Sequence, residues 1–433
     1  MSCQASIVIP TYNRRELLRL TLESLARQDA RTASFEVIVV DDGSTDGSLQ
    51  AVQEFASRLD VSCVRQEHLG FRVGRARNLG VERARGDTVV FVDSGMVLAS
   101  RFVSSHLAAH GDGAPVAVLG YVHGYDFNIS SPELIKTLHL VEADPDSSIA
   151  AMAATHVGLD IREHVYRVIH DRMDGLPAPW TLFWTTNVSL SRKAFHDAGG
   201  FDEDFAQWGM EDIELGFRLW RKGVRFLLSR QAAGIHYPHE RDNAANLRSH
   251  AENRRLFLYK HPTIESEAFL ASDPLRFNFE LLHYRSHEQA RSALWRERMS
   301  AGALGTGKGE LGRVGAVVFG FRDGRLLALC DSRAGIDADA ARVASASQQY
   351  PGVDVGAQLG IRTSFADRQF DSCLLAGAAL GLPKPWLMAM AAEAARIARR
   401  SHALVFDKVP FELHGTNTIA RLGDGLNLCE LGR

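Results

Sequence analysis

Short apolar runs alternate with amphipathic segments over the first 93 residues, and this alternation constrains the fold more than any other feature of the chain. Residues 5–10, 35–40 and 88–92 are apolar runs of strand length, whereas residues 14–28 carry leucines at the i, i+4, i+7 spacing of a helix. Strands that alternate with helices through short connections form mostly parallel, doubly wound sheets. We therefore predict an α/β fold with such a sheet in the N-terminal half.

The C-terminal part of the chain restarts a shorter α/β pattern after a glycine-rich stretch. At roughly 150 residues per domain, a chain of 433 residues predicts two or three domains. We expect a large domain over residues 1–262, a helical connector and linker over residues 263–310, and a smaller α/β domain over residues 311–433. In the smaller domain, apolar runs predict strands at 314–319, 326–330 and 403–406 and helices at 338–348 and 388–398.

Charge and cysteine content narrow the classes of partner and compartment. A net charge of -3 provides no positive field to hold a phosphate backbone, so nucleic acid is not expected as a partner. Five scattered cysteines without a CxxC pair predict neither a zinc site nor a disulfide framework. No run reaches the roughly 18 apolar residues of a membrane span, and the start lacks the pattern of a signal peptide. We expect a cytoplasmic protein, in solution or peripheral at a membrane.

The segment at residues 187–218 carries the most chemistry, because an indole, a glycine and two carboxylates meet at a predicted helix start. Glu211 and Asp212 open that helix, where the macrodipole favours carboxylates, so helix capping alone is one explanation. Trp208 and Gly209 directly precede them, and a glycine lets a ligand approach the backbone. A carboxylate beside an indole suits a sugar hydroxyl, whose proton it can accept as the hydroxyl attacks.

The motifs of the N-terminal half resemble those of inverting family-two glycosyltransferases with the GT-A fold, in the branch of chondroitin polymerases and polypeptide N-acetylgalactosaminyltransferases. The resemblance covers residues 5–262, and its motifs, in order, are IVIPTYNR, VIVVDDGSTDGS, HLGFRVGRARNLG, GDTVVFVDSGM, WGMEDIEL and GIHYPHE. It implies a doubly wound mixed sheet and a hexosyltransferase. Such an enzyme moves a sugar from a nucleotide-diphosphate sugar, with a UDP-sugar as the expected donor, to an acceptor hydroxyl.

The resemblance assigns donor binding to the ends of the first strands and to a helix after them. Asp42 would accept a hydrogen bond from the uracil imide N–H, because a carboxylate can only accept; alternatively, its DDGS sequence is merely a turn. Arg77 would lie near the diphosphate, to which a guanidinium donates in pairs, or else be a solvated helix residue. The donor-binding positions carried over are Pro10, Thr11, Tyr12, Asp42, Arg77, Asn78 and Asp93.

The resemblance also names the reacting groups. Asp212 would be the general base, with Glu211 beside it, and Asn187, Trp208 and Gly209 would contact the acceptor or the transferred sugar. Retaining relatives tend to have asparagine at the position of Asp212, so the Glu-Asp pair favours a single displacement with inversion. A glycan, a lipid-linked precursor, a peptide or a small molecule remains open as the acceptor.

The metal motif of the family is incomplete in this chain. The family pattern is Asp-x-Asp, but the triplet here reads Asp93-Ser94-Gly95, so one carboxylate ligand for a hard cation is missing. His236 and His239 in GIHYPHE stand where relatives supply a later ligand, although a structural role for both histidines is an alternative. We expect Mn²⁺ or Mg²⁺ with Asp93 and His236 as ligands, and leave open whether activity requires the metal.

The C-terminal domain faintly resembles a degenerate class I methyltransferase. It lacks a glycine-rich loop after its first strand, and Asp331 is the expected ribose-binding acid at the end of the second strand. We favour a role in acceptor recognition or in dimerisation to a homo-oligomer. The alternatives are a bifunctional enzyme that also uses S-adenosylmethionine, and a non-catalytic sugar-nucleotide-binding protein. Two decoys are set aside: GALGTGK at 302–308 lacks the P-loop hydroxyl, and residues 281–299 are expected to be a solvated connector.

Overall fold

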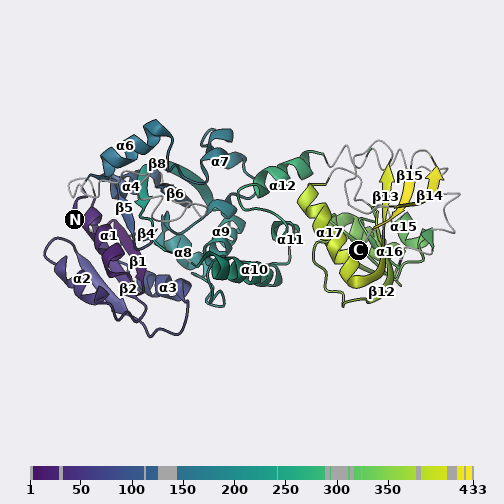
Figure 1. The fold of residues 1–433 in the computed structure, drawn as a ribbon, viewed down its shortest axis with the longest axis horizontal. Helices are drawn as coiled ribbons and strands as arrows, with labels where there is room; N and C mark the ends of the chain where they lie inside the picture. The colour runs from purple at the N-terminus through teal and green to yellow at the C-terminus, as the bar shows by residue number, and fades with distance from the viewer. Residues whose placement is uncertain are drawn as a thin grey trace. The chain divides into compact units, whose positions relative to one another are not determined.

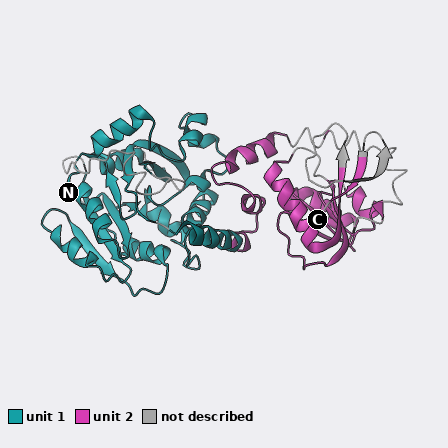
Figure 2. Ribbon diagram, viewed as in Figure 1, with its two compact units in different colours: residues 1–257 teal, residues 258–433 magenta. Residues whose placement is uncertain are grey.

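The chain folds into two compact units, Met1–Phe257 and Leu258–Arg433, coloured teal and magenta in Figure 2. Each unit is built around its own sheet. The computed structural model describes residues 3–28, 33–111, 114–124, 144–240, 242–287, 293, 311–312, 316–322, 324–376, 382–406, 417–423 and 426–431.

The described residues of the first unit form an eight-stranded mixed sheet in the order β3-β2-β1-β4-β7-β6-β8-β5. Figure 1 labels its strands β1, β2, β4, β5, β6 and β8. Neighbours β3, β2, β1 and β4 are parallel, whereas β7 runs antiparallel to β4 and β6. The predicted doubly wound mixed sheet is therefore confirmed. The strands are β1 (Ala5–Thr11), β2 (Phe35–Asp41), β3 (Val61–Arg65), β4 (Thr88–Val92), β5 (Met96–Leu98), β6 (Val116–His123), β7 (Asn187–Ser191) and β8 (Arg225–His236).

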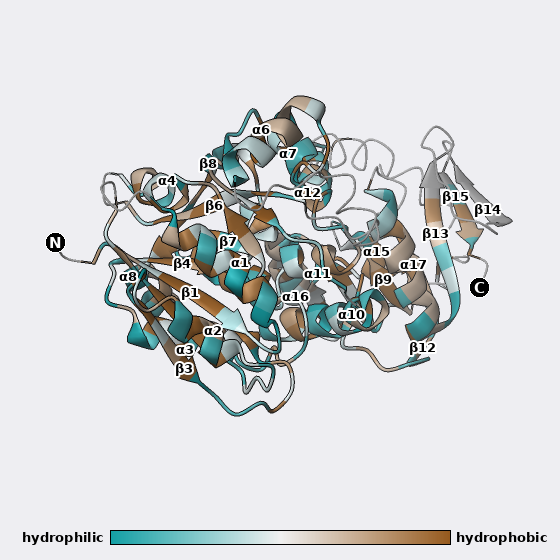
Figure 3. Cartoon of the chain, turned by 60° about the vertical axis from the view of Figure 1, so that its left-hand side comes forward, coloured by the Kyte–Doolittle hydropathy of each residue, from teal (hydrophilic) through white to brown (hydrophobic). Residues whose placement is uncertain are grey.

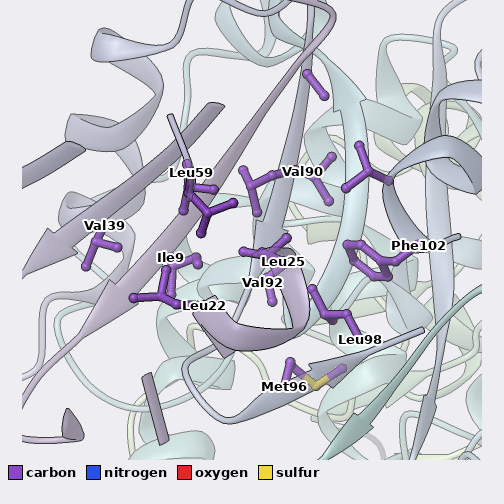
Figure 4. Packing of buried hydrophobic residues seen from close by; sticks show 14 of the residues in the cluster. Ile9, Leu22, Leu25, Val39, Leu59, Val90, Val92, Met96, Leu98 and Phe102 are labelled. Carbon is purple, nitrogen blue, oxygen red and sulfur yellow. The ribbon is translucent and has the colours of Figure 1, made fainter. Parts of the chain in front are cut away.

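Helices cover both faces of this sheet and fix its core. Leu22 and Leu25 of the first helix pack with Ile9, Val39 and Val92 from alternate strand positions (Figure 4). Figure 3 shows β1 and β4 in the brown of hydrophobic residues. The helices are α1 (Arg15–Ala26), α2 (Ser48–Glu54), α3 (Val73–Arg83), α4 (Phe102–Ala109), α6 (Pro145–Thr155), α7 (Glu163–Val168), α8 (Arg192–Ala198), α9 (Glu211–Arg221) and α10 (Asn243–Lys260), whose last residues extend into the second unit.

The opposite face of β1 receives α3 at a glycine. A Cβ on Gly80 would lie 2.4 Å from Val8 and 3.2 Å from Val40, so only glycine lets α3 approach this close to β1 and β2. Because β1, β2 and β4 are parallel, their carboxyl ends meet at one edge of the sheet. The residues that follow these strands directly are Tyr12, Asp42 and Asp93.

The described residues of the second unit form a smaller seven-stranded sheet in the order β11-β10-β9-β12-β13-β15-β14. Strands β11, β10, β9, β12 and β13 are parallel to one another, whereas β15 runs antiparallel to both β13 and β14. The strands are β9 (Val317–Phe319), β10 (Ala334–Asp337), β11 (Asp354–Ala357), β12 (Phe370–Leu375), β13 (Ala398–Phe406), β14 (Asn417–Gly423) and β15 (Leu426–Glu430). Its helices are α11 (Ile264–Leu270), α12 (Phe277–Ser286), α15 (Arg325–Leu329), α16 (Ala340–Gln349) and α17 (Lys384–Ile397).

Two sequence predictions for the second unit are wrong. The predicted strand at 326–330 is helix α15, since a five-residue apolar run has no periodicity that separates a strand from a buried helical turn. The second strand is instead β10, whose terminal acid is Asp337, while Asp331 lies in a left-handed conformation after α15. Phe321 and Arg322 follow β9 with buried side chains in place of a glycine-rich loop, so the methyltransferase resemblance gains no support.

The helical segment expected as a connector packs against the second unit. Trp386 of α17 donates from its indole Nε1 to Ser272 Oγ at 2.8 Å and to Glu280 Oε2 at 3.1 Å. Glu267 of α11 accepts from the backbone amides of Leu359, Gly360 and Ile361 at 2.7–2.8 Å. The P-loop-like stretch at 302–308 lies outside the described residues. The same holds for the predicted connector beyond residue 287, apart from Ala293. Across the described parts of the chain, every helix is too short or too polar to cross a membrane.

Candidate active site

The ends of β1 and β2 are locked together by the DDGSTDGS segment. The backbone amide of Asn13 donates to Ser44 Oγ at 2.9 Å, and the amide of Thr45 donates back to Asn13 Oδ1 at 2.8 Å. The amide of Arg15, at the start of α1, donates to Asp46 at 2.8 Å. The segment is therefore a turn, as one interpretation of the sequence held, and it also fixes the residues on either side of it.

Asp42 and Tyr12, both predicted to bind the nucleotide base, contact the same residue, His68. Asp42 accepts from Gln66 Nε2 at 2.6 Å and contacts the His68 ring Nδ1 at 2.8 Å. The His68 ring stacks on Tyr12 with centroids 3.8 Å apart and planes 3° apart. Thr11 Oγ1 is buried close by in sequence and has no hydrogen-bond partner in the described structure. Gln66 and His68 were missed, because only the pairing of β3 with β2 brings them to Asp42.

Pro10 contributes through its backbone. Its carbonyl accepts from Ser94 Oγ at 2.6 Å, which ties the end of β1 to the Asp93-Ser94-Gly95 triplet that follows β4. The predicted base contact of Pro10 is not tested by this arrangement. The hydrogen bond does place Ser94 inside the protein, so the middle residue of the triplet has a structural partner.

Arg77 stands at the centre of a buried charge network. It is 4% exposed, and its guanidinium donates to Glu211 at 3.0 Å and to Asp93 at 2.9 Å. Thr186 Oγ1 donates to the other oxygen of Asp93 at 3.0 Å, and the Phe201 ring lies 5.5 Å from the guanidinium carbon. Arg77 is therefore not a solvated helix residue, and it pairs with a glutamate that lies 134 positions further along the sequence.

The network is not saturated. Arg77 Nε and Glu211 Oε2 are buried and have no hydrogen-bond partner among the residues that the structure describes. Unpaired buried polar atoms are rare in folded proteins and call for an explanation, such as a ligand that completes them. Two such atoms in one network mark this part of the first unit as a candidate site.

Asp212 sits beside this network at the start of α9. The residue is partly exposed, and its carboxylate accepts from the backbone amides of Ile213 at 2.8 Å and Thr185 at 3.2 Å. Burial within the surrounding protein and the negative charge of Glu211 raise the pKa of Asp212 to about 7, although Arg77 opposes this shift. The N-cap residue of α9 is Met210, so neither carboxylate is the N-cap. Such a group is charged and protonated in comparable amounts near neutral pH.

Helix α10 holds the segment before α9 from behind. Asn253 Nδ2 donates to the carbonyls of Gly209 at 2.6 Å and Gln207 at 3.1 Å, and Ser249 Oγ donates to that of Trp208 at 3.1 Å. Gly209 has φ +89, a left-handed conformation that favours glycine. Trp208 itself remains partly exposed. The indole is therefore carried on a backbone that α10 fixes, close in sequence to Asp212.

Two asparagines predicted to contact ligands use their side-chain amides within the protein, and their ligand contacts stay predictions. Asn187 is fully buried in β7, where its Nδ2 donates to the carbonyls of Tyr121 and Ala232 and its Oδ1 contacts His106 at 2.8 Å. Asn78 Nδ2 donates to the Phe201 carbonyl at 2.9 Å, and its Oδ1 accepts from the Phe201 amide at 2.8 Å. Both residues position backbone, and sequence alone does not separate an amide that binds a ligand from one that binds its own chain.

The predicted metal ligands lie near each other across two strands. Met96 pairs with His236, and the Tyr237 amide donates to the Gly95 carbonyl at 2.9 Å, so the triplet that begins with Asp93 runs beside the end of β8. The His239 ring Nε2 contacts the Arg14 guanidinium at 2.6 Å. Since a guanidinium only donates, His239 accepts there.

A complete protein-only metal site is not present in the described part of the chain, where no group of three or more His, Cys, Asp or Glu residues could hold an ion. Gly95 has no side chain that could serve as a metal ligand. A Cβ at this position would lie 3.3 Å from the Leu17 side chain. One carboxylate and one imidazole nevertheless suit a hard cation that takes its remaining oxygen ligands from water and substrate phosphates, as Mg²⁺ usually does. The residues present therefore fit a metal that is shared with the donor.

Comparisons with known proteins define the class. Two family models match in succession: glycosyl transferase family 2 over residues 6–158 and the N-terminal domain of galactosyltransferase over residues 168–240. The chain belongs to glycosyltransferase family 2 and is a glycosyltransferase. It is 36% identical to a validoxylamine A glucosyltransferase of Streptomyces hygroscopicus subsp. jinggangensis, over 91% of this chain and 95% of that protein.

Other relatives match a smaller part of the chain. A chondroitin synthase of Pasteurella multocida is 33% identical over 51% of this chain, which corresponds to 23% of that enzyme. Among solved structures, TarS of Staphylococcus aureus in complex with UDP-GlcNAc superposes with a TM-score of 0.45 at 19% identity, over 72% of this chain and 80% of that one. The family model and the relative at 36% identity confirm the predicted family. The eight-stranded mixed sheet of the first unit agrees with the predicted α/β class.

Proposed function

We propose that this enzyme transfers a sugar from a UDP-sugar to an acceptor hydroxyl with inversion, and that Asp212 is the general base. The observation that carries the proposal is the setting of Asp212: two backbone amides orient its carboxylate, and burial raises its pKa to about 7. A general base works best when its pKa lies near the operating pH, because it is then both available and basic enough.

Glu211 and Arg77 act on Asp212 and Asp93, and their unpaired atoms Arg77 Nε and Glu211 Oε2 remain available to the donor. The charge of Glu211 keeps the pKa of Asp212 raised, and Arg77 holds Glu211 and Asp93 in one network. Because both oxygens of Asp93 have partners on the protein, its orientation is fixed before any ligand arrives. Groups that are oriented in advance stabilise developing charge without the cost of reorganisation.

The transfer is a single displacement. Asp212 accepts the proton of the acceptor hydroxyl while that oxygen forms a bond to the anomeric carbon. The bond from the anomeric carbon to the diphosphate oxygen breaks on the opposite face, and the nucleoside diphosphate leaves. Attack and departure on opposite faces invert the anomeric centre, so NMR of the product should show the opposite anomeric configuration to that of the donor.

Tyr12 and Asp42 are the proposed partners of the nucleotide base. Both oxygens of Asp42 already have a partner, but each carboxylate oxygen offers more than one acceptor site, so an imide N–H can still bond to it. Trp208, held by α10, is the proposed surface for the acceptor or the transferred sugar. Pro10, Asn78 and Asn187 stay predicted ligand contacts, and each also makes a hydrogen bond within the protein.

A divalent cation, Mn²⁺ or Mg²⁺, would be held by Asp93 and His236 together with oxygens of the donor. When bound, it would neutralise charge that develops on the leaving diphosphate. Treatment with EDTA should abolish transfer, and Mn²⁺ or Mg²⁺ should restore it. Unchanged activity after EDTA would remove the metal from the proposal and leave the role of Asp212 untouched.

The full-length similarity to a validoxylamine A glucosyltransferase directs the choice of substrates. Since 91% of this chain aligns with 95% of that enzyme, we propose glucose as the sugar and validoxylamine A as the first acceptor to test. Chondroitin oligosaccharides are the second candidate, because a chondroitin synthase is also similar to about half of this chain. Product formation from UDP-glucose with each acceptor, followed by mass spectrometry, tests the proposal; donor hydrolysis without either product would keep the enzyme class and reject both acceptors.

A further inference from the structure

His68 makes the two contacts that the proposed base site offers to a nucleotide. Its planar ring lies flat on Tyr12 at 3.8 Å, and its Nδ1 is 2.8 Å from Asp42 Oδ2. Because a carboxylate only accepts, Nδ1 carries the proton and donates to Asp42. A uracil ring that used this site would need the same stacking surface and the same acceptor for its imide N–H.

The surroundings of His68 suit a side chain that can leave. Its side chain is 33% exposed, and it is followed by Leu69 and Phe71, which are 63% and 40% exposed. Gly70 between them has φ +86, and a Cβ there would meet nothing within 4 Å. Little protein therefore packs against the outer side of this segment, so rotation of the ring into solvent would disrupt few contacts.

The inner side of the site would survive the departure of His68. Gln66 is 8% exposed, and its Nε2 holds the other oxygen of Asp42 at 2.6 Å, so Asp42 would keep its orientation. Two buried polar atoms beside this pair, Gln66 Oε1 and Thr11 Oγ1, have no hydrogen-bond partner in the described structure. Such atoms are the expected mark of a site whose natural ligand is not the histidine.

We propose that His68 is an internal surrogate for the donor base, which occupies the stacking surface of Tyr12 and the acceptor of Asp42 until the nucleotide displaces it. The inference rests on the proposed donor site. It adds that the affinity for the donor is reduced by the fraction of molecules in which His68 is in place, because only the others are competent to bind the base. His68 is thus a residue that sets donor affinity, although the donor-bound enzyme does not need it.

Calorimetric titration of the full-length protein with UDP tests the inference. In the His68→Ala variant UDP should bind about tenfold more tightly, because the base no longer breaks a stacked contact and a hydrogen bond to a carboxylate. His164→Ala, at an exposed histidine of α7, is the matched control and should leave the affinity unchanged. Tyr12→Ala should weaken UDP binding. Pyrophosphate, which has no base, should bind wild type and His68→Ala equally.

The outcomes separate the two levels of the argument. If wild type and His68→Ala bind neither UDP nor GDP, the proposed donor site fails. If wild type binds UDP but His68→Ala binds it more weakly or equally, His68 is a wall of the site or a bystander, and the surrogate role is overturned. NMR of the His68 ring in the wild type gives a second readout, since UDP should shift its signals to those of a solvent-exposed histidine.

Discussion

Both units contain carboxylates whose pKa is raised by burial, but the protein surrounds these carboxylates differently in each unit. In the second unit, Asp337 at the end of β10 accepts from the amides of Arg322 and Asp339, both at 2.9 Å, and pairs with Arg342. Glu267 is enclosed by backbone amides in the same way. In the first unit, the network around Arg77 leaves buried polar atoms without partners, and Asp212 beside it is partly exposed.

A raised pKa does not by itself separate the two cases. Burial raises the pKa of Asp337 and of Glu267, as it does for Asp212. The difference lies in the surroundings: Asp337 and Glu267 are almost completely buried with backbone partners, whereas Asp212 is a partly exposed residue beside a network with unpaired buried atoms. An enclosed carboxylate stabilises a loop, and an accessible one can exchange a proton with a substrate.

The largest expected effect concerns that proton. Asp212→Asn should lower the rate of sugar transfer by about 10³-fold, because an amide cannot accept the hydroxyl proton, while the Kd for UDP stays the same. Initial rates with UDP-glucose and calorimetry with UDP measure the two quantities.

The matched variants come from both units. Asp197→Asn, at an exposed carboxylate of α8 that pairs with Lys193, should keep the wild-type rate. Asp337→Asn should keep the rate per folded molecule and lower the stability of the second unit. A loss of UDP binding in Asp212→Asn, or an equal loss of rate in Asp337→Asn, would break the distinction between the units.

The next effect is on stability. Arg77→Met should lower the free energy of unfolding of the first unit by about 3–5 kcal/mol, because Asp93 and Glu211 lose the cation between them. Arg342→Met removes the partner of Asp337 in the second unit, where backbone amides remain, and should cost about 1 kcal/mol. Chemical denaturation followed by fluorescence compares them, and equal losses would mean that the Arg77 network is an ordinary capped ion pair.

The sequence predicted the elements whose pattern is local. The apolar strands, the DDGS turn and the helix that starts at Glu211 follow from periodicity and turn residues, and the motifs identified the family. Partners across the sheet could not be predicted, so Gln66 and His68 were missed at Asp42. Helix α15 was predicted as a strand for a related reason, since five apolar residues fit either element until their packing is known.

The role of Asn187 shows the same limit and gives a third prediction. Asn187→Ala should destabilise the first unit by about 2 kcal/mol, because the carbonyls of Tyr121 and Ala232 and the ring of His106 lose a buried partner. The KM for the acceptor should not change in the fraction that stays folded. An increased KM with normal stability would restore the acceptor contact that the sequence predicted.

The smallest expected effect links activity to stability through pH. The pKa of Asp212 is raised from 3.8 to about 7, so the folded protein holds this proton more tightly than the unfolded chain does. Stability from this group is therefore complete below about pH 4 and falls as pH rises to about 7, while the transfer rate rises over pH 6–8 as the base becomes charged. Asp212→Asn is neutral at every pH, so it should raise the free energy of unfolding by about 1 kcal/mol at pH 8 and by less at pH 5. The expected gain is small because solvent screens charge at a partly exposed residue. Urea denaturation at the two pH values measures the difference. An inactive variant that is equally or less stable at pH 8 would mean that the pKa of Asp212 is not raised, and the case for this carboxylate as the base would lose its physical ground.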